Sequence, residues 1–221
     1  MTLGIAIPTY KEHLPFLDRL LWSIGKSTVL PDEVYISASE VEDYSFYPEN
    51  DYGLNLIINI TKNKRNPAHN TNFALGNLTT DIYSVIGGDD MVHPQRNEFI
   101  LRAFEDKSVQ IIVHNFKQSL DIDMDFLNTP HKEITLMVDY IDTILPNCIY
   151  PTSAIEQPTF ANAFISFRRY IFDKFQYDES VDAEFLEDSL YNRNLVMEGY
   201  KISYIKEKLA LYLKNPIRPN K

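Results

Sequence analysis

The feature that most constrains the fold is a regular alternation of apolar runs and amphipathic segments over residues 1–115. Short runs rich in Ile, Val and Leu are typical of buried strands, and the segments between them repeat apolar residues at helical spacing. Such a chain is expected to form an α/β fold, a mostly parallel central sheet with helices on both faces. The expected strands are 3–10 (stopping at Pro8), 32–37, 54–60, 81–86 and 109–116, and the expected helices are 14–25, 66–78 and 94–104. In the first helix Leu14, Leu17, Leu21 and Ile24 recur at helical spacing, and the second is expected to begin with Asn66 as its cap and Pro67 as its first residue.

The second half of the chain is less regular. Residues 117–160 carry scattered acids, prolines and aromatic residues, and we expect loops and a short helix there. Residues 164–172 predict a strand that runs into a turn or short helix, and a longer helix ending at Gly199 precedes a strand at 200–205. Four residues of that helix follow helical spacing, namely Leu186, Leu190, Arg193 and Met197. We find no internal repeat or linker, so one domain over residues 1–221 is expected.

Composition narrows the possible functions. No apolar run approaches the ~20 residues that span a bilayer, and the N-terminus lacks the pattern of a secretory signal. We therefore expect a cytoplasmic protein without a transmembrane segment. The net charge of −10 would repel phosphate backbones, so nucleic acid is not an expected partner. An acidic chain that binds a phosphate ligand would need local help, such as a metal ion.

Two glycines and two carboxylates, Gly87, Gly88, Asp89 and Asp90, follow the predicted strand 81–86. Ligands of parallel sheets bind at the carboxyl ends of strands. Carboxylate oxygens suit Mg²⁺ or Mn²⁺, which such sites hold together with substrate phosphates. Gly, Asp and Pro also form turns, so a simple turn is the alternative. The position at a strand end favours the cation site.

The other candidate residues have plainer alternatives. Glu187 and Asp188 open the last helix, where a carboxylate serves as a general base or only favours the positive helix end. Spacing alone favours the second role. Arg168 and Arg169 could clamp an anion, with one of the two expected to face solvent. The histidines show no metal-ligand spacing, and no phosphate-binding Gly-rich motif is present.

Four segments, taken in order, resemble family 2 glycosyltransferases of the GT-A fold. They are IAIPTYKE at 5–12, AHNTNFALGNLTTDIYSVIGGDDMVHP at 68–94, FRRYIFDKFQYDES at 167–180 and LEDSLYNRNLVMEGYKI at 186–202. Together they span most of the chain. The resemblance implies a single GT-A domain, with a nucleotide-binding half at about 1–115 and an acceptor-binding half at about 116–221.

The resemblance also implies roles for individual residues. Asp89, assisted by Asp90, would bind a Mn²⁺ or Mg²⁺ ion that bridges both phosphates of the donor. Asp188, supported by Glu187, would deprotonate an acceptor hydroxyl in a single displacement with inversion. The donor would be a UDP-, GDP- or TDP-linked sugar, and the acceptor a glycan, a lipid-linked molecule or a protein. The base and ribose would be held by Pro8, Thr9, Tyr10 and Glu12.

This sequence departs from the family pattern at three positions. Ser39 stands where the family usually has an acid at the end of the second strand, so the contact with the base is expected to differ. His69 stands where the family often has Arg, which would make a phosphate-side contact weaker or pH-sensitive. Gly87 replaces the first acid of the metal motif and places more weight on Asp89.

Two other classes of protein are weighed against a glycosyltransferase. A sugar-nucleotide-forming nucleotidyltransferase would share the sheet and the metal, but would want a Gly-rich loop after the first strand. The segment IPTYKEHLP has no glycine. A non-catalytic nucleotide-sugar-binding module would fit the three departures, but Asp89 and Asp188 are both present. The glycosyltransferase is therefore ranked first.

Overall fold

The computed structural model describes residues 1–47, 50–138, 164–180 and 187–213. Their strands are β1 (Leu3–Tyr10), β2 (Glu33–Ser39), β3 (Leu56–Thr61), β4 (Ile82–Val85), β5 (Met91–Val92), β6 (Ile111–Ser119), β7 (Leu136–Met137), β8 (Ile165–Arg168) and β9 (Ile202–Leu213). Their helices are the 3₁₀ turn η1 (Lys11–His13), α1 (Leu14–Gly25), α2 (Pro67–Gly76), α3 (Arg96–Phe104), α4 (Met124–Asn128), α6 (Arg169–Phe172) and α7 (Glu187–Met197).

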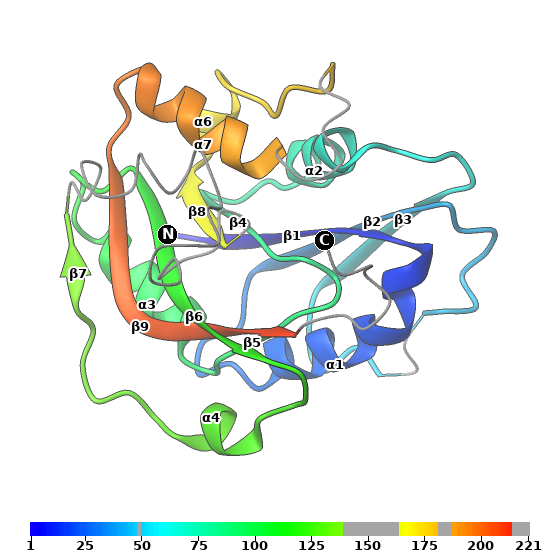
Figure 1. The fold of residues 1–221 in the computed structure, drawn as a ribbon, viewed down its shortest axis with the longest axis horizontal. Helices are drawn as coiled ribbons and strands as arrows, with labels where there is room; N and C mark the ends of the chain where they lie inside the picture. The colour runs from blue at the N-terminus through cyan, green and yellow to red at the C-terminus, as the bar shows by residue number, and fades with distance from the viewer. Residues whose placement is uncertain (48–49, 139–163, 181–186, 214–221) are drawn as a thin grey trace.

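The described strands form one sheet in the order β3-β2-β1-β4-β8-β6-β9-β5, with β7 paired to β9 (Figure 1). Parallel ladders join β3, β2, β1 and β4, and a further one joins β6 to β9. β8 runs antiparallel between β4 and β6, and β5 and β7 are also antiparallel to β9. The expected α/β fold is therefore confirmed, with an antiparallel strand inserted near the centre of the sheet.

Helices cover both faces of this sheet. The side chains of Leu3, Ile5 and Ile7 alternate with Gly4 and Ala6 along β1, so one strand serves two cores. Leu3 packs in the cluster of α3, whereas Ile5 and Ile7 pack in the cluster of α1. Ala6 belongs to the cluster on the opposite face, beneath α2, α6 and α7. None of the helices among the described residues is long and apolar enough to cross a membrane.

The local signals in the first half are largely confirmed. Asn66 caps α2, because its side-chain oxygen accepts a hydrogen bond from the His69 amide at 2.7 Å, and Pro67 occupies the first turn. β1 does not stop at Pro8 as expected but continues to Tyr10. Its ladder with β4 ends at Ala6, whereas its ladder with β2 runs on through Pro8. Near a strand end a proline sacrifices few ladder hydrogen bonds.

The residues of α7 that repeat at helical spacing do not all lie on its buried face. Leu186 is outside the described residues, and Leu190 is partly buried. Met197 is 72% exposed and Arg193 is also exposed, whereas Tyr191 and Leu195, one turn apart, are buried in the core. Tyr191 stacks on Tyr177, with ring centroids 3.9 Å apart, and this contact sets the orientation of the helix. Helical spacing predicts the helix but does not show which of its faces has an aromatic partner.

The region expected to hold loops and a short helix is described only to residue 138. It contains the end of β6, the short helix α4 and the two-residue strand β7. Asp123 caps α4 by accepting a hydrogen bond from the Phe126 amide at 2.9 Å. Residues 139–163 lie outside the described part.

Candidate active site

The GGDD loop lies at the carboxyl end of β4, as expected, and is pressed against the end of β1. A Cβ atom on Gly88 would lie 2.4 Å from Thr9 Oγ1 and 2.9 Å from Thr9 Cβ, so the loop approaches β1 this closely only because residue 88 is glycine. The side chains of Asp89 and Asp90 are nearly buried, with 5% and 3% exposure. Two carboxylates are thus held below the surface at the edge where α/β sheets bind ligands.

A histidine from η1 and an arginine from α1 approach this loop. His13 Nε2 lies 3.4 Å from Asp89 Oδ2, and an Arg19 guanidinium nitrogen donates to the Asp89 carbonyl. Burial lowers the pKa of Arg19, while the charges of Asp89 and Asp90 act in the opposite direction. Asp90 has a different role, because its Oδ1 accepts a hydrogen bond from the Leu213 amide of β9 at 3.2 Å. The loop is therefore fixed to α1 on one side and to β9 on the other.

The two carboxylates have the ligand chemistry of a hard divalent cation. The described residues contain no group of three or more His, Cys, Asp and Glu side chains that could hold a metal. A closed protein cage is therefore not formed by these residues. Two adjacent carboxylates suit the other kind of site, in which Mg²⁺ or Mn²⁺ takes its remaining ligands from water and substrate phosphates.

The ends of β1 and β2 carry buried hydroxyl groups beside this loop. Ser39 is the register partner of Tyr10, so both strands end at the same level. Thr9 Oγ1 and Ser39 Oγ are buried and make no hydrogen bond to the described protein. Pro8 and Tyr10 are partly exposed, and Glu12 in η1 is exposed. Buried hydroxyls without partners cost free energy, so this edge offers unused hydrogen-bonding capacity to a ligand.

A polar relay fixes the ends of these strands to α2. Asn70 donates from Nδ2 to the Thr9 carbonyl at 2.7 Å, and its Oδ1 accepts from Ser37 Oγ at 2.5 Å. Arg65 then donates to Ser37 Oγ at 2.8 Å, and its guanidinium lies 4.0 Å from the Phe73 ring centroid. Sequence reasoning missed this relay. The available signal was a buried-face asparagine in α2, where an apolar residue would be expected.

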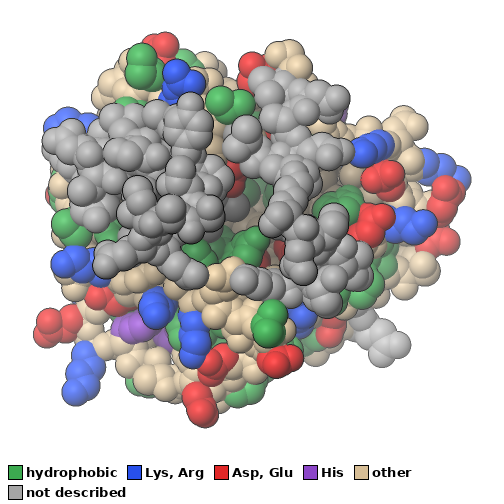
Figure 2. Space-filling view, in the orientation of Figure 1, with side chains coloured by type: hydrophobic (Ala, Val, Ile, Leu, Met, Phe, Trp, Pro, Cys, Tyr) green, Lys and Arg blue, Asp and Glu red, His purple; other side chains and the backbone are tan. Residues whose placement is uncertain are grey.

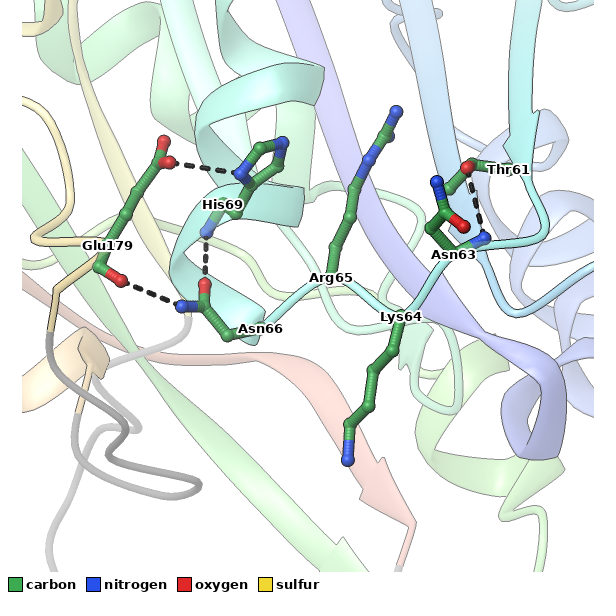
Figure 3. A pocket seen from close by; sticks show the side chains of 7 residues that line it. All are labelled: Thr61, Asn63, Lys64, Arg65, Asn66, His69 and Glu179. Atoms are coloured by element: carbon green, nitrogen blue, oxygen red, sulfur yellow. Dashed lines mark hydrogen bonds and ion pairs between the residues drawn. The ribbon is translucent and has the colours of Figure 1, made fainter.

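A cavity of about 440 Å³ opens beside the relay, at the end of β3 and the start of α2 (Figure 3). His69 Nδ1 lies 3.0 Å from Glu179 Oε2 on its wall, so the expected phosphate-side residue is paired with a carboxylate. Glu179 was also missed by sequence reasoning, since it is more than 100 positions away in the chain. The lining residues are Thr61, Asn63, Lys64, Arg65, Asn66, His69 and Glu179.

Glu187 and Asp188 form the first turn of α7, which lies beside α2 on the same face of the sheet (Figure 1). Asp188 Oδ1 accepts a hydrogen bond from the Ser189 amide at 2.6 Å. Both carboxylates lie near the phenol of Tyr177. The pKa of that phenol is raised well above its ordinary value by burial first, and then by the charges of Tyr191, Asp188 and Glu187.

Arg168 and Arg169 lie near the amino end of β4, at the end of the sheet opposite to the GGDD loop. The antiparallel register pairs Arg168 with Ile82, at the amino end of β4, whereas the GGDD loop follows its carboxyl end. Arg168 donates to the carbonyls of Val109 and Phe104, each at 2.9 Å. Arg169 donates to the Thr79 carbonyl at 3.1 Å. The structure therefore does not bring this pair to the other candidate residues, and its role as an anion clamp stays a prediction.

Charged side chains on the face shown in Figure 2 are mixed in sign. Acidic and basic groups of the described residues both occur around the rim of the molecule. The candidate site also has charged groups below the surface. Among these, Asp89 and Asp90 are negative, and Arg19 is the neighbouring cation.

Solved structures share this architecture. Residues 1–349 of S. aureus TarS in complex with UDP-GlcNAc superpose with a TM-score of 0.72 at 17% identity, covering 97% of this chain and 59% of that one. A mannosyltransferase, PcManGT from Pyrobaculum calidifontis in complex with GDP-Man and Mn²⁺, gives a TM-score of 0.67 at 17% identity, with 98% and 58% covered. This chain thus spans about three fifths of the length of these proteins, and the likeness shows a shared GT-A fold.

Family assignment rests on the sequence model of the family. No curated protein sequence matches the chain at a significant level. The family model described as glycosyl transferase family 2 matches residues 4–175, which include β1, the GGDD loop and β8. Because this match covers most of the chain, the protein belongs to glycosyl transferase family 2.

Proposed function

We propose that this chain transfers a sugar from a nucleoside-diphosphate sugar to an acceptor hydroxyl, with inversion and with a divalent cation. The observation that carries the proposal is the GGDD loop, which holds two buried carboxylates against the end of β1. Membership of the family makes glycosyl transfer the first candidate. A nucleotidyltransferase is disfavoured, since the turn after β1, Lys11–His13, lacks the glycines that such a loop requires.

The donor nucleotide would lie across the ends of β1 and β2. Thr9 and Ser39 offer buried hydroxyls with unused hydrogen-bonding capacity, which a base or ribose can fill. Pro8, Tyr10 and Glu12 would complete the contacts, and His69 would approach the phosphate side. The nucleotide-sugar complexes of TarS and PcManGT support a nucleoside-diphosphate sugar as donor, and the Mn²⁺ of PcManGT supports a divalent cation.

Asp89 would be the main ligand of Mn²⁺ or Mg²⁺, with Asp90 assisting from the same loop. A cation bound there supplies positive charge to the diphosphate leaving group and allows a chain of net charge −10 to bind it. The Leu213 amide holds Asp90 Oδ1 and so orients this carboxylate. An Arg19 guanidinium nitrogen donates to the Asp89 carbonyl and so fixes the backbone of Asp89.

Asp188 would act as general base. Its carboxylate would take the proton from the acceptor hydroxyl while that oxygen forms a bond to the anomeric carbon. The bond from the anomeric carbon to the diphosphate breaks in the same step, which inverts the configuration. Glu187 would support the base from the same helical turn. Both acids lie at the amino end of α7, where carboxylates interact favourably with the helix dipole.

The test combines ligand-induced stabilisation with turnover. Thermal unfolding is measured with UDP, GDP, TDP, CDP and ADP, each with and without Mn²⁺, and transfer is measured with the corresponding sugar nucleotides. At a hundredfold excess over Kd, a bound nucleotide adds about 2.7 kcal/mol to the free energy of unfolding. Asp89→Asn should lose the Mn²⁺-dependent gain. Asp188→Asn should keep this gain but lose turnover, because a base acts only in the chemical step.

The matched control is Asp121→Asn, which removes one exposed carboxylate far along the chain from both acids. It should behave as the wild type in both measurements. Wild-type turnover in Asp188→Asn would exclude Asp188 as the base. A nucleotide affinity that does not depend on Mn²⁺ or on Asp89 would exclude the cation site.

A further inference from the structure

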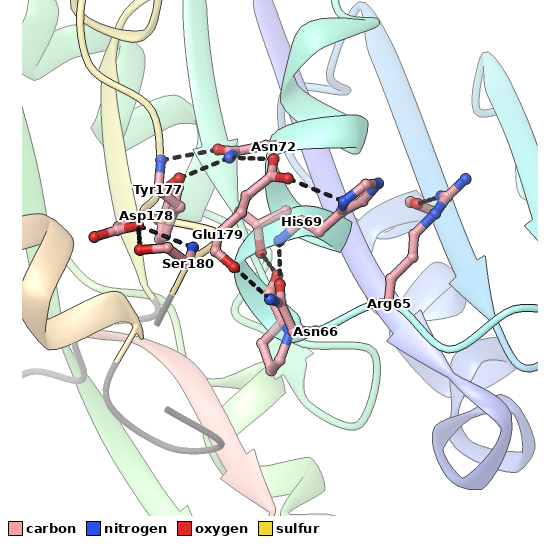
Figure 4. A network of polar contacts seen from close by, with 11 residues as sticks. Arg65, Asn66, His69, Asn72, Tyr177, Asp178, Glu179 and Ser180 are labelled. Atoms are coloured by element: carbon pink, nitrogen blue, oxygen red, sulfur yellow. Dashed lines mark hydrogen bonds and ion pairs between the residues drawn. The ribbon is translucent and has the colours of Figure 1, made fainter. Parts of the chain in front are cut away.

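One buried asparagine connects α2 with the segment 177–179, which precedes the acids of α7 in the chain. Asn72 lies on α2, only 8% exposed, and its side-chain amide makes three hydrogen bonds to the segment 177–179. Nδ2 donates to the Tyr177 carbonyl and to Glu179 Oε1, both at 2.8 Å. Oδ1 accepts from the Tyr177 amide at 2.9 Å. The side chain thus satisfies both backbone groups of Tyr177, as a neighbouring strand would (Figure 4).

The same face of α2 holds this segment at two further points. Asn66 donates from Nδ2 to the Glu179 carbonyl at 2.9 Å, and His69 pairs with the Glu179 carboxylate at 3.0 Å. Asn66, His69 and Asn72 are spaced three residues apart, so their side chains lie along one side of the helix. The central contact is the buried one, since the other two lie at the more exposed start of α2.

Tyr177 connects the segment 177–179 to α7 through a contact between aromatic rings. Its ring stacks on that of Tyr191 at a centroid distance of 3.9 Å and an interplanar angle of 9°, and both residues are buried. Tyr191 follows Glu187 by four residues and Asp188 by three, so it lies on the same side of α7 as the acidic first turn. The charges of both acids contribute to the raised pKa of Tyr177, which agrees with their proximity.

We propose that Asn72 is a positioning residue for the reaction, holding Tyr177 so that its stack with Tyr191 sets where the Asp188 carboxylate lies relative to the donor. The inference rests on the proposed role of Asp188. Under this proposal α2 fixes the end of β1 through Asn70 and also positions α7 through Asn72. A displacement of about 1 Å at a catalytic group can cost on the order of a hundredfold in rate, so the loss of this attachment should act on kcat.

The kinetic test uses Asn72→Ala, with Asn77→Ala as the matched control at the end of the same helix. Asn77 is exposed and its side chain donates only to the Phe73 carbonyl of α2. Asn72→Ala should lower kcat about 10- to 100-fold while the KM for the donor stays within about twofold. Asn77→Ala should leave both constants unchanged. Equal kcat in the two variants, or a loss confined to KM, would overturn the proposal.

A reciprocal exchange separates positioning from simple loss of fold. Asn72→Asp keeps the shape of the side chain but places a carboxylate against Glu179, so kcat should fall further. Adding Glu179→Gln to this variant restores a donor opposite the introduced carboxylate and should recover at least threefold of kcat. If the double variant is no better than Asn72→Asp, the contact with Glu179 does not position the base.

A measurement without substrate makes the outcome independent of the proposed activity. Amide hydrogen exchange in Glu187–Met197 should be faster in Asn72→Ala than in Asn77→Ala, because α7 loses its attachment to α2. Equal exchange in both variants would overturn the positioning role even if transfer is observed. If the wild type transfers no sugar from any nucleotide donor, the proposed function fails, and this exchange measurement still decides whether Asn72 holds α7.

Discussion

Gly88 offers a sharp test of the contact between the GGDD loop and β1. A methyl group at this position would lie 2.4 Å from Thr9 Oγ1 and 2.9 Å from Thr9 Cβ, both closer than atoms can approach. Thr9 is buried and belongs to a strand paired on its β2 side, so it cannot move away cheaply. Overpacking of this kind costs about 1–3 kcal/mol. For a chain of this size, that corresponds to a fall in Tm of roughly 2–12 °C.

Gly76→Ala is the matched control for Gly88→Ala. It lies in α2, and its added methyl would meet only Phe172 Cε1 at 3.9 Å, which is ordinary contact. Alanine is favoured over glycine in a helix by up to about 1 kcal/mol, so this variant should be neutral or more stable. Thermal unfolding and Mn²⁺-dependent nucleotide binding are measured for both. Equal Tm and equal affinity in the two variants would show that the loop does not press on β1.

Two further predictions concern a buried histidine and the arginine pair. Burial first, and then the Arg96 charge, lower the pKa of His114 well below its ordinary value of 6.5, so the folded protein holds it neutral while the unfolded chain protonates it. Stability is therefore lost as the pH falls below 6.5, and from about pH 7.5 to 5.5 the wild type should lose about 1.4 kcal/mol more than His114→Gln. If the free energy of unfolding of the wild type and of His114→Gln falls by the same amount over this pH range, the prediction is contradicted. Arg168→Ala removes the donor to three carbonyls, those of Phe104, Asp106 and Val109, and should lower the free energy of unfolding by about 1–3 kcal/mol. Calorimetry should find its nucleotide affinity unchanged, and a tenfold weaker Kd would return Arg168 to the ligand site.

The parts of the fold that were predicted correctly depend on local patterns. The buried side of α1, with Leu17, Leu21 and Ile24, follows directly from its spacing, and the Asn66 cap of α2 was visible in sequence. The GGDD loop was placed correctly because a strand end is a local feature. These signals are fixed by neighbours within one or two turns, so no tertiary information is needed to detect them.

The remaining features depend on partners that are distant in the chain. Arg168 lies at the amino end of β4, away from the GGDD loop, because β8 runs antiparallel to β4. Hydrophobic periodicity carries no information on strand direction, so this position could not be predicted. The orientation of α7 depends on the stacking of Tyr177 with Tyr191. Asn70 and Asn72 are polar residues on the buried side of α2, and only the backbone groups that they contact explain them. Sequence reasoning therefore named the candidate acids but not the asparagine side chains that connect α2 to the segments around them.

The antiparallel insertion of β8 between β4 and β6 has a consequence for how the protein folds during synthesis. β1 to β4 leave the ribosome early, and β4 can pair with β1 at once. Its second native neighbour, β8, is made only about 80 residues later, roughly 4–16 s at ordinary rates of translation. During that interval the edge of β4 is open, and β6, which is already made, is an available but incorrect partner. The nascent chain is therefore at risk of pairing β4 with β6. Once β8 is made, it must insert between these two strands before the native sheet is complete.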